Sequence, residues 1–139
     1  MSDVTLIDNT EEVKELLNEA IEQALEAVGI QAEGYAKLNL ETDPRRINTG
    51  NLRNSITYVT EPEEKAVYVG TNVEYGIYVH EGTGKYAYDG GGRQDPWSYQ
   101  DDEGNWHRTS GMMPNRFLVD AAENYADEYR DIFESYLKG

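Results

Sequence analysis

Hydrophobic side chains recur every three or four residues between residues 9 and 40, which is the spacing of one face of an α-helix. Asn9 and Glu12 have the spacing of a capping box, so the helix is expected to begin at Asn9. Gly29 and Gly34 should weaken its second half, and it should end before Pro44. The apolar stripe consists of Val13, Leu16, Leu17, Ala20, Ile21, Ala24, Leu25, Val28, Ala32, Tyr35 and Ala36.

The pattern changes from helical spacing to alternation after a short loop. Residues 49–51, Thr-Gly-Asn, have turn chemistry. Residues 52–60 and 65–70 then alternate between apolar and polar side chains, which predicts two strands. Residues 61–64, Glu-Pro-Glu-Glu, form a polar connection suited to a hairpin. This region therefore predicts a small antiparallel sheet.

Residues 75–81 return to helical spacing, because Tyr75, Tyr78 and Val79 fall on one face. We expect a short helix here, with both tyrosine rings packed on the sheet and their hydroxyls at a subunit surface. The expected core positions of the central region are Leu52, Ile56, Val67, Val69 and Val79. Turns with unusual backbone angles are expected at Gly50, Gly82 and Gly84.

Residues 85–111 differ in composition from the rest of the chain. Glycines crowd the start of this segment, and two aromatic stretches flank Asp102-Glu103-Gly104. We interpret the segment as a β-hairpin arm with a tight acidic turn, and we expect Trp97 and Trp106 to pair across it. Its glycine-rich base predicts an arm that moves. Tyr99 lies between these tryptophans in the sequence and is included among the candidate contact residues.

A second apolar stripe over residues 115–138 predicts a C-terminal helix. The stripe consists of Phe117, Leu118, Ala121, Ala122, Tyr125, Tyr129, Ile132, Phe133 and Tyr136. Strands bracketed by helices indicate an α+β fold, with the C-terminal helix packed on a small antiparallel sheet. With 139 residues and no internal repeat, residues 1–139 are expected to form a single domain.

Composition excludes several classes of protein. The chain has no cysteine, so disulfides, thiolate metal sites and cysteine nucleophiles are absent. Its N-terminal residues lack the basic and apolar segments of a secretory signal, and no apolar run approaches the length of a membrane span. Eleven tyrosines against two phenylalanines suit half-buried surfaces, either of the core or of an interface.

Charge is strongly negative and unevenly distributed. The net charge of −15 argues against general binding to nucleic acid, whose phosphates would repel the chain. Residues 1–43 hold eleven acidic and two basic side chains, whereas Arg45, Arg46 and Arg53 follow with no acid among them. We interpret these three arginines as a small basic loop and as candidate contact residues, although solvated faces are the default explanation of surface charge.

No catalytic, metal or cofactor site emerges from the motifs. His80, Glu81 and His107 are metal-ligand types, but adjacent residues do not converge on one ion. No Gly-x-Ser-x-Gly frames a serine, and Gly82-Thr83-Gly84-Lys85 lacks the spacing of a phosphate loop. We expect no enzyme activity, no metal and no cofactor, and instead a small acidic protein that binds other proteins.

Three ordered segments resemble the small tail-component, or head–tail joining, proteins of long-tailed bacteriophages and prophages. They are TGNLRNSI (residues 49–56), VGTNVEYGIYVHEGTG (residues 69–84) and MPNRFLVDAA (residues 113–122). The chain departs from the family pattern at Gly76, at His80 and at Val119-Asp120, where the family more often has alanine, glutamate and Arg-Pro. The arm also resembles an insertion seen in members from phages of Gram-positive bacteria.

The resemblance implies a virion structural protein without catalysis, located at the head–tail junction or in the tail after assembly in the host bacterial cytoplasm. Its implied partners are copies of itself in a ring and the neighbouring connector, stopper, tail-terminator or tail-tube proteins. DNA would pass nearby without specific binding, and no membrane is involved. The candidate contact residues for these partners are Arg45, Arg46, Arg53, Tyr75, Tyr78, Trp97, Tyr99 and Trp106. The alternative interpretation, based on the charge of −15, is an acidic DNA mimic that inhibits a DNA-binding protein.

Overall fold

The structure is a computed structural model that describes residues 10–43 and 49–138, with only the backbone at Thr49. Asn9, Arg45 and Arg46 lie outside the described residues. The elements in chain order are α1 (Thr10–Glu41), α2 (Thr49–Ser55), β1 (Thr57–Glu61), β2 (Ala66–Gly70), α3 (Gly76–Glu81), the short 3-10 helix η1 (Gly84–Tyr86), β3 (Trp97–Gln100), β4 (Trp106–Thr109), α4 (Phe117–Glu123) and α5 (Ala126–Leu137). The predicted α+β class is confirmed.

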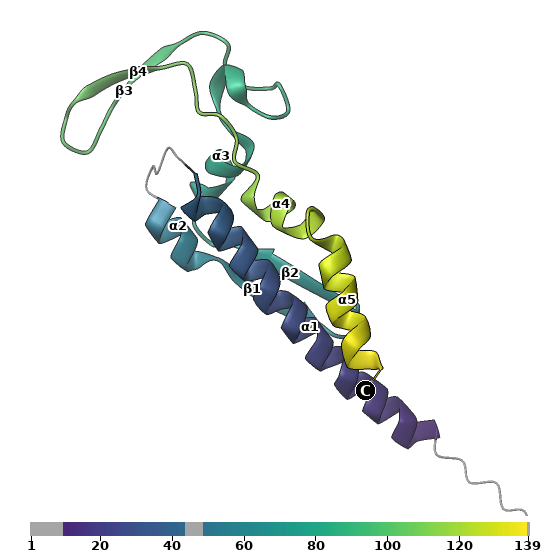
Figure 1. The fold of residues 1–139 in the computed structure, drawn as a ribbon. Coiled ribbons are helices and arrows are strands. Elements are labelled where there is room, and N and C mark those ends of the chain that lie inside the picture. Colours follow the sequence, from purple (N-terminus) through teal and green to yellow (C-terminus); the bar gives the residue numbers. More distant parts are fainter. Residues whose placement is uncertain (1–9, 44–48, 139) are drawn as a thin grey trace, which may run out of the picture.

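The long helix α1 is the central element, against which the hairpin, α2, α4 and α5 pack. Its prediction from the apolar stripe is confirmed. The β1–β2 hairpin packs on one side of α1, while α4 and α5 run along another side (Figure 1). Gly29 lies at the contact with the hairpin, where an added Cβ would be 2.3 Å from Cδ2 of Tyr58. The glycine that weakens the helix is thus the position that lets the sheet approach it. At the same contact, the Tyr58 hydroxyl donates a hydrogen bond to the carboxylate of Glu26 over 2.5 Å.

Residues 49–55 form the helix α2, so the expected turn followed by the start of a strand is wrong. In a strand Asn54 would share a face with Leu52 and Ile56. The helical turn instead exposes Asn54 and leaves Leu52 and Ile56 only 0% and 2% exposed. Gly50 lies inside this helix and has no positive φ, so its expected unusual backbone angle is also wrong.

The hairpin itself agrees with the sequence pattern from Thr57 onward. β1 and β2 are antiparallel, from the pair Thr57 and Gly70 to the pair Glu61 and Ala66. Within the described residues neither strand pairs with a third one, so this sheet has two open edges. The open edge of β2 faces the side of the molecule that holds α4 and α5 (Figure 1).

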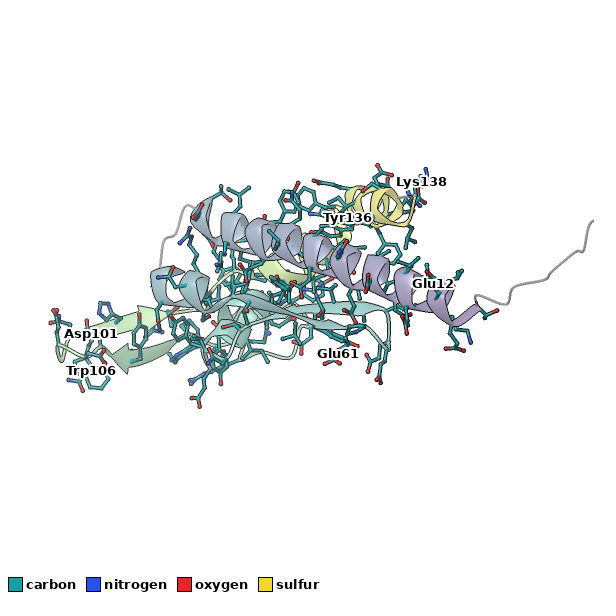
Figure 2. All side chains as sticks on the ribbon, turned by 90° about the horizontal axis from the view of Figure 1, so that it is seen from below. Glu12, Glu61, Asp101, Trp106, Tyr136 and Lys138 are labelled. Carbon is teal, nitrogen blue, oxygen red and sulfur yellow. The ribbon has the colours of Figure 1, made fainter. Side chains whose placement is uncertain are left out.

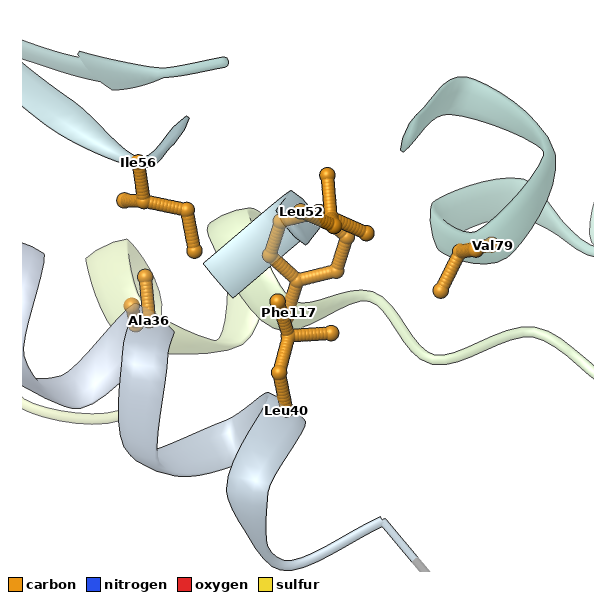
Figure 3. Close-up of a cluster of buried hydrophobic side chains, with 7 residues drawn as sticks. Ala36, Leu40, Leu52, Ile56, Val79 and Phe117 are labelled. Atoms are coloured by element: carbon orange, nitrogen blue, oxygen red, sulfur yellow. The ribbon is translucent and has the colours of Figure 1, made fainter. Parts of the chain in front are cut away.

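The main core lies where α1, α2, α3 and α4 meet (Figure 3). Its buried members are Ala36, Leu40, Leu52, Ile56, Val79, Phe117 and Ala121. Of the expected core positions, Leu52, Ile56 and Val79 are buried, whereas Val67 and Val69 are half-buried on the sheet. Tyr75 packs against this core between the helices, and Tyr78 is 59% exposed, so the expected packing of Tyr78 on the sheet is wrong.

The predicted C-terminal helix is two helices, α4 and α5, rather than one. The helix breaks at Tyr125, whose φ of −120° and ψ of 21° depart from helical backbone. The break places the ring of Tyr125 flat on that of Tyr35, with ring centroids 3.6 Å apart. Beside this stack the Tyr129 hydroxyl donates to the carbonyl of Ala121, which ties α5 back to α4. Aromatic packing against α1 therefore sets the bend between α4 and α5.

Two glycines turn the chain into the base of the arm, as expected. Gly82 and Gly84 have φ values of 77° and 63°. An added Cβ at Gly84 would lie 2.1 Å from the carbonyl oxygen of Ser110, so only glycine lets the two sides of the base approach. The Thr83 N–H donates to the Met112 carbonyl over 2.8 Å, which joins these two sides.

The arm is a hairpin that leaves the body of the molecule (Figure 1). Gln100 lies opposite Trp106 and Trp97 lies opposite Thr109, so the expected pairing of the two tryptophans is wrong. The turn closes between Gln100 and Trp106, which puts Trp106 near the tip and Trp97 at the base. The predicted mobility of residues 85–111 stays a prediction.

Candidate interaction surfaces

Of the three candidate arginines, Arg53 lies within the described residues. Arg53 lies on α2, and its guanidinium forms an ion pair with Glu41 at the end of α1. This pair joins α2 to α1, so Arg53 already has an acidic partner within its own chain. Glu41 is likewise paired and is less available to a neighbouring subunit.

Helix α3 carries an exposed apolar pair. Ile77 is 64% exposed and Tyr78 is 59% exposed, whereas the neighbouring Val79 is buried. Among the candidate contact residues, Tyr78 therefore lies at the surface, whereas Tyr75 is half-buried. The sequence did not indicate Ile77 as a surface residue, because an apolar side chain between Tyr75 and Val79 in the sequence resembles one more core position.

One face of the arm is packed within the arm itself. Trp97, Tyr99 and His107 lie on this face, because Tyr99 and His107 are cross-strand partners and Trp97 is two residues from Tyr99. The rings of Tyr99 and His107 stack with centroids 5.2 Å apart. The guanidinium of Arg93 lies 5.7 Å from the ring of Trp97. These side chains already have partners.

Asp101 organises the turn of the arm. Its carboxylate accepts the N–H groups of Glu103 and Asn105 over 3.0 and 2.8 Å and lies 2.7 Å from Nε2 of His107. These hydrogen bonds, led by that from His107, hold the pKa of Asp101 below its ordinary value. The acidic turn that the sequence indicates is therefore a hydrogen-bonded structure centred on the carboxylate of Asp101.

The opposite face of the arm, here called its free face, is exposed at Ser98, Gln100, Trp106 and Arg108. Trp106 and Arg108 are two residues apart on β4 and so lie on this second face. Trp106 is 71% exposed, more than any other large hydrophobic residue of the described chain. Arg108 is exposed, and no described residue forms an ion pair with it. Figure 2 shows Trp106 and Asp101 at one extreme of the molecule.

An apolar groove runs beside the open edge of β2. Its first part, of about 410 Å³, lies between α1, β2, α4 and α5. Its second part, of about 370 Å³, continues to α3, and Leu118 and Val119 line both parts. Sequence analysis missed this groove, although a sheet of only two strands beside an apolar helix was a usable signal.

The first turns of α1 are apolar and exposed. Val13, Leu16 and Leu17 belong to the apolar stripe, yet they are 52%, 60% and 49% exposed. They extend beyond the region that the hairpin and α5 cover (Figure 1). This end of α1 is a second candidate contact surface, at the opposite extreme of the molecule from the arm tip.

His80 is a buried structural histidine. Its Nδ1 lies 3.0 Å from Oε1 of Glu81, and its Nε2 accepts the N–H of Val119 over 3.3 Å. Both ring nitrogens are thus used within the chain. Among the described residues no three His, Cys, Asp or Glu side chains gather as metal ligands would.

A more polar hollow of about 770 Å³ lies between the end of α1 and the start of α4. Its polar groups bind one another: Asn115 donates to Asp43 over 2.9 Å, and the Arg116 guanidinium lies 3.9 Å from the ring of Tyr88. These contacts hold the chain between the arm and α4.

In the part of the chain that the structure describes, no helix has the length and apolar character needed to cross a bilayer.

Comparison with known families accounts for the first two of the three sequence motifs, whereas the third, at residues 113–122, lies outside the match. The family described as "Bacteriophage HK97-gp10, putative tail-component" matches residues 5–101, which is well over half of the chain. The match includes the motifs at residues 49–56 and 69–84, together with α1, the β1–β2 hairpin and the first strand of the arm. Searches of the curated proteins and of the solved structures each found no match. The chain therefore belongs to the HK97-gp10-like family of bacteriophage tail components.

Proposed function

We propose that this tail component is a structural protein of the head–tail junction or upper tail that forms ring-type contacts around the DNA channel. The observation that carries the proposal is the arm. A two-stranded hairpin alone is only marginally stable in water, and Trp106 at its tip is 71% exposed. We expect a protein partner to cover this ring, since tryptophan is enriched at interfaces.

The proposed ring joins two different surfaces of the molecule. The arm lies at one extreme, and the first turns of α1, marked by Glu12, lie at the other (Figure 2). A contact between two different patches is heterologous, and it closes into a ring when the rotation per subunit divides a full turn. Trp97 and Tyr99 on the arm, Tyr75 and Tyr78 near α3, and the arginines at 45, 46 and 53 are further proposed contact residues.

Neighbouring layers of the particle supply the other proposed partners. A ring at this location touches a connector or stopper on the side of the head and a tail-terminator or tail-tube protein on the other side. The role is structural, needs no cofactor and begins in the cytoplasm of the host bacterium. The net charge of −15 keeps DNA from adhering as it passes through the channel.

The same charge favours the alternative function, an acidic DNA mimic that inhibits a DNA-binding protein. A mimic would bind a nuclease or repressor tightly, and added salt would weaken the complex strongly. Membership of a tail-component family favours the structural role instead. Absence of the protein from purified particles, together with salt-sensitive binding to a DNA-binding enzyme, would establish the mimic.

Gold labelling of intact particles tests the proposed location. Glu63 is exposed in the turn between β1 and β2, so an epitope inserted there should leave the core intact. We expect gold at the junction of head and tail or in the upper tail. Gold along the full tail length, or no gold on particles that contain the tagged protein, would contradict the proposed location.

A further inference from the structure

The groove beside β2 is apolar and holds one full charge. The side chains that line its two parts come from α1, β2, α3, α4 and α5 and include Val28, Val67, Ile77, Leu118, Val119 and Ala122. The single acidic or basic side chain among the lining residues, histidine apart, is Glu74, at the end near α3. Glu74 is exposed, and no described residue forms an ion pair with it. The groove therefore suits an apolar occupant with one positive charge.

The edge of β2 adds a backbone component to this groove. β2 pairs only with β1 among the described strands, so its second edge presents N–H and C=O groups to the groove. An extended segment that enters the groove can pair with this edge, which is a common mode of peptide recognition. The preferred occupant is thus a strand.

The free face of the arm has the complementary chemistry. Trp106 supplies a large exposed apolar ring, and Arg108 supplies the only full charge on β3 and β4. These two residues point to the same side of the strand, about 7 Å apart along it. No residue of the arm lines the groove of its own chain, and the arm leaves the body (Figure 1). The match is therefore between different molecules.

We propose that the groove beside β2 receives the arm of a second copy, with Trp106 in its apolar part and Arg108 facing Glu74. The inference rests on the proposed ring and names the two surfaces that join its subunits. The contact is heterologous, so each copy gives an arm to one neighbour and receives an arm from the other.

Charge reversal tests the contact in the phage or prophage whose own copy of the gene is interrupted at Gln31. Plasmid copies of the protein then restore the infectious titre. We expect Arg108→Glu and Glu74→Arg each to lower the titre at least about tenfold, because like charges then meet at the contact. The double variant should recover most of the loss. The matched controls are Lys138→Glu and Glu63→Arg, which change the same charges at exposed positions outside the groove.

Cross-linking inside particles tests the same contact without altering its proposed anchors. The protein has no cysteine, so Ser98→Cys together with Ile77→Cys introduces the only thiols. Ser98 lies opposite Arg108 on the arm, and Ile77 lines the groove near Glu74. Oxidation should give a ladder of this protein's multimers, whereas Ser98→Cys with Gln23→Cys, on the exposed face of α1, should give monomers.

The two tests separate failure of the contact from failure of the proposed function. Normal titres in both single charge variants would overturn the contact, as would a double variant no better than either single one or cross-links only to a different protein. Normal particles from the interrupted gene itself would overturn the proposed function. Loss of joined particles in that strain, with unaffected charge variants, would reject only the arm-in-groove contact.

Discussion

At the scale of single residues, the two glycines Gly29 and Gly34 of α1 differ in what surrounds them. Its added Cβ would lie 2.3 Å from Tyr58, whereas an added Cβ at Gly34 meets nothing within 4 Å. We expect Gly29→Ala to destabilise the protein, because the ring and its hydrogen bond to Glu26 must move. Gly34→Ala, the matched control, should stabilise it by up to about 1 kcal/mol through helix propensity. Urea unfolding measures both, and equal effects would contradict the close approach.

Tyr129 gives the protein a predicted stability loss in alkali. Burial, followed by the nearby Tyr35 and Glu128, raises the pKa of Tyr129 to about 12 from the ordinary value of 10.0. Its neutral form is therefore favoured in the folded state, so its contribution is complete below pH 10 and is lost as the pH rises toward 12. Tyr129→Phe should flatten the fall in unfolding free energy across this range. An unchanged slope would contradict the assignment.

At the scale of elements, Asp101 accepts the hydrogen bonds that close the turn of the arm. Asp101→Ala removes the acceptor for Glu103, Asn105 and His107, so we expect the hairpin to lose order while the body stays folded. Asp102→Ala is the control, since Asp102 is an exposed neighbour in the same turn. Nuclear magnetic resonance shifts of β3 and β4 report the change.

Acid should reproduce the effect of Asp101→Ala. The folded protein lowers the pKa of Asp101. The ionised carboxylate therefore stabilises the hairpin fully at pH values above the pKa of the unfolded chain, and this stabilisation is lost as the pH falls through the folded pKa. Retention of the hairpin shifts in Asp101→Ala would show that the turn does not depend on this side chain.

The sequence predicts elements well where one periodicity dominates. The stripe in α1, the alternation in β1 and β2, and the spacing of α3 are each confirmed. It fails where tertiary contacts choose between local options. α2 forms because a helix buries Leu52 and Ile56 but exposes Asn54, and α4 and α5 separate because Tyr125 stacks on Tyr35. Neither contact is visible in a local window of sequence.

The candidate contact residues were predictable by type rather than by arrangement. Trp106 and Tyr78 are exposed aromatic residues, as a contact residue must be. Trp97, in contrast, is half-buried beneath Arg93. A sheet of only two strands signals an open edge at β2, but the size of the groove beside it depends on how far α4 lies from that edge. Such spacing follows from the packing of both elements on α1.

At the scale of the whole molecule, Arg45 and Arg46 provide a test of ring contacts that is independent of the arm. Arg53 pairs with Glu41 inside its own chain, so the two other arginines of the basic sequence are the better candidates for a neighbour. We expect the double variant Arg45→Glu, Arg46→Glu to assemble poorly and to keep the unfolding midpoint of the wild type. Native mass spectrometry of assemblies and thermal unfolding of the protomer measure the two quantities. Full assembly by this variant would remove these residues from the proposed interface.

The central claim is that particles need this protein to join or complete their tails. Electron microscopy of a lysate from the phage or prophage with a stop codon at Gln31 tests it most directly. We predict DNA-filled heads beside separate tails, and restoration of joined particles by the intact gene supplied in trans. Normal, intact and infectious particles in the absence of the protein would contradict the account.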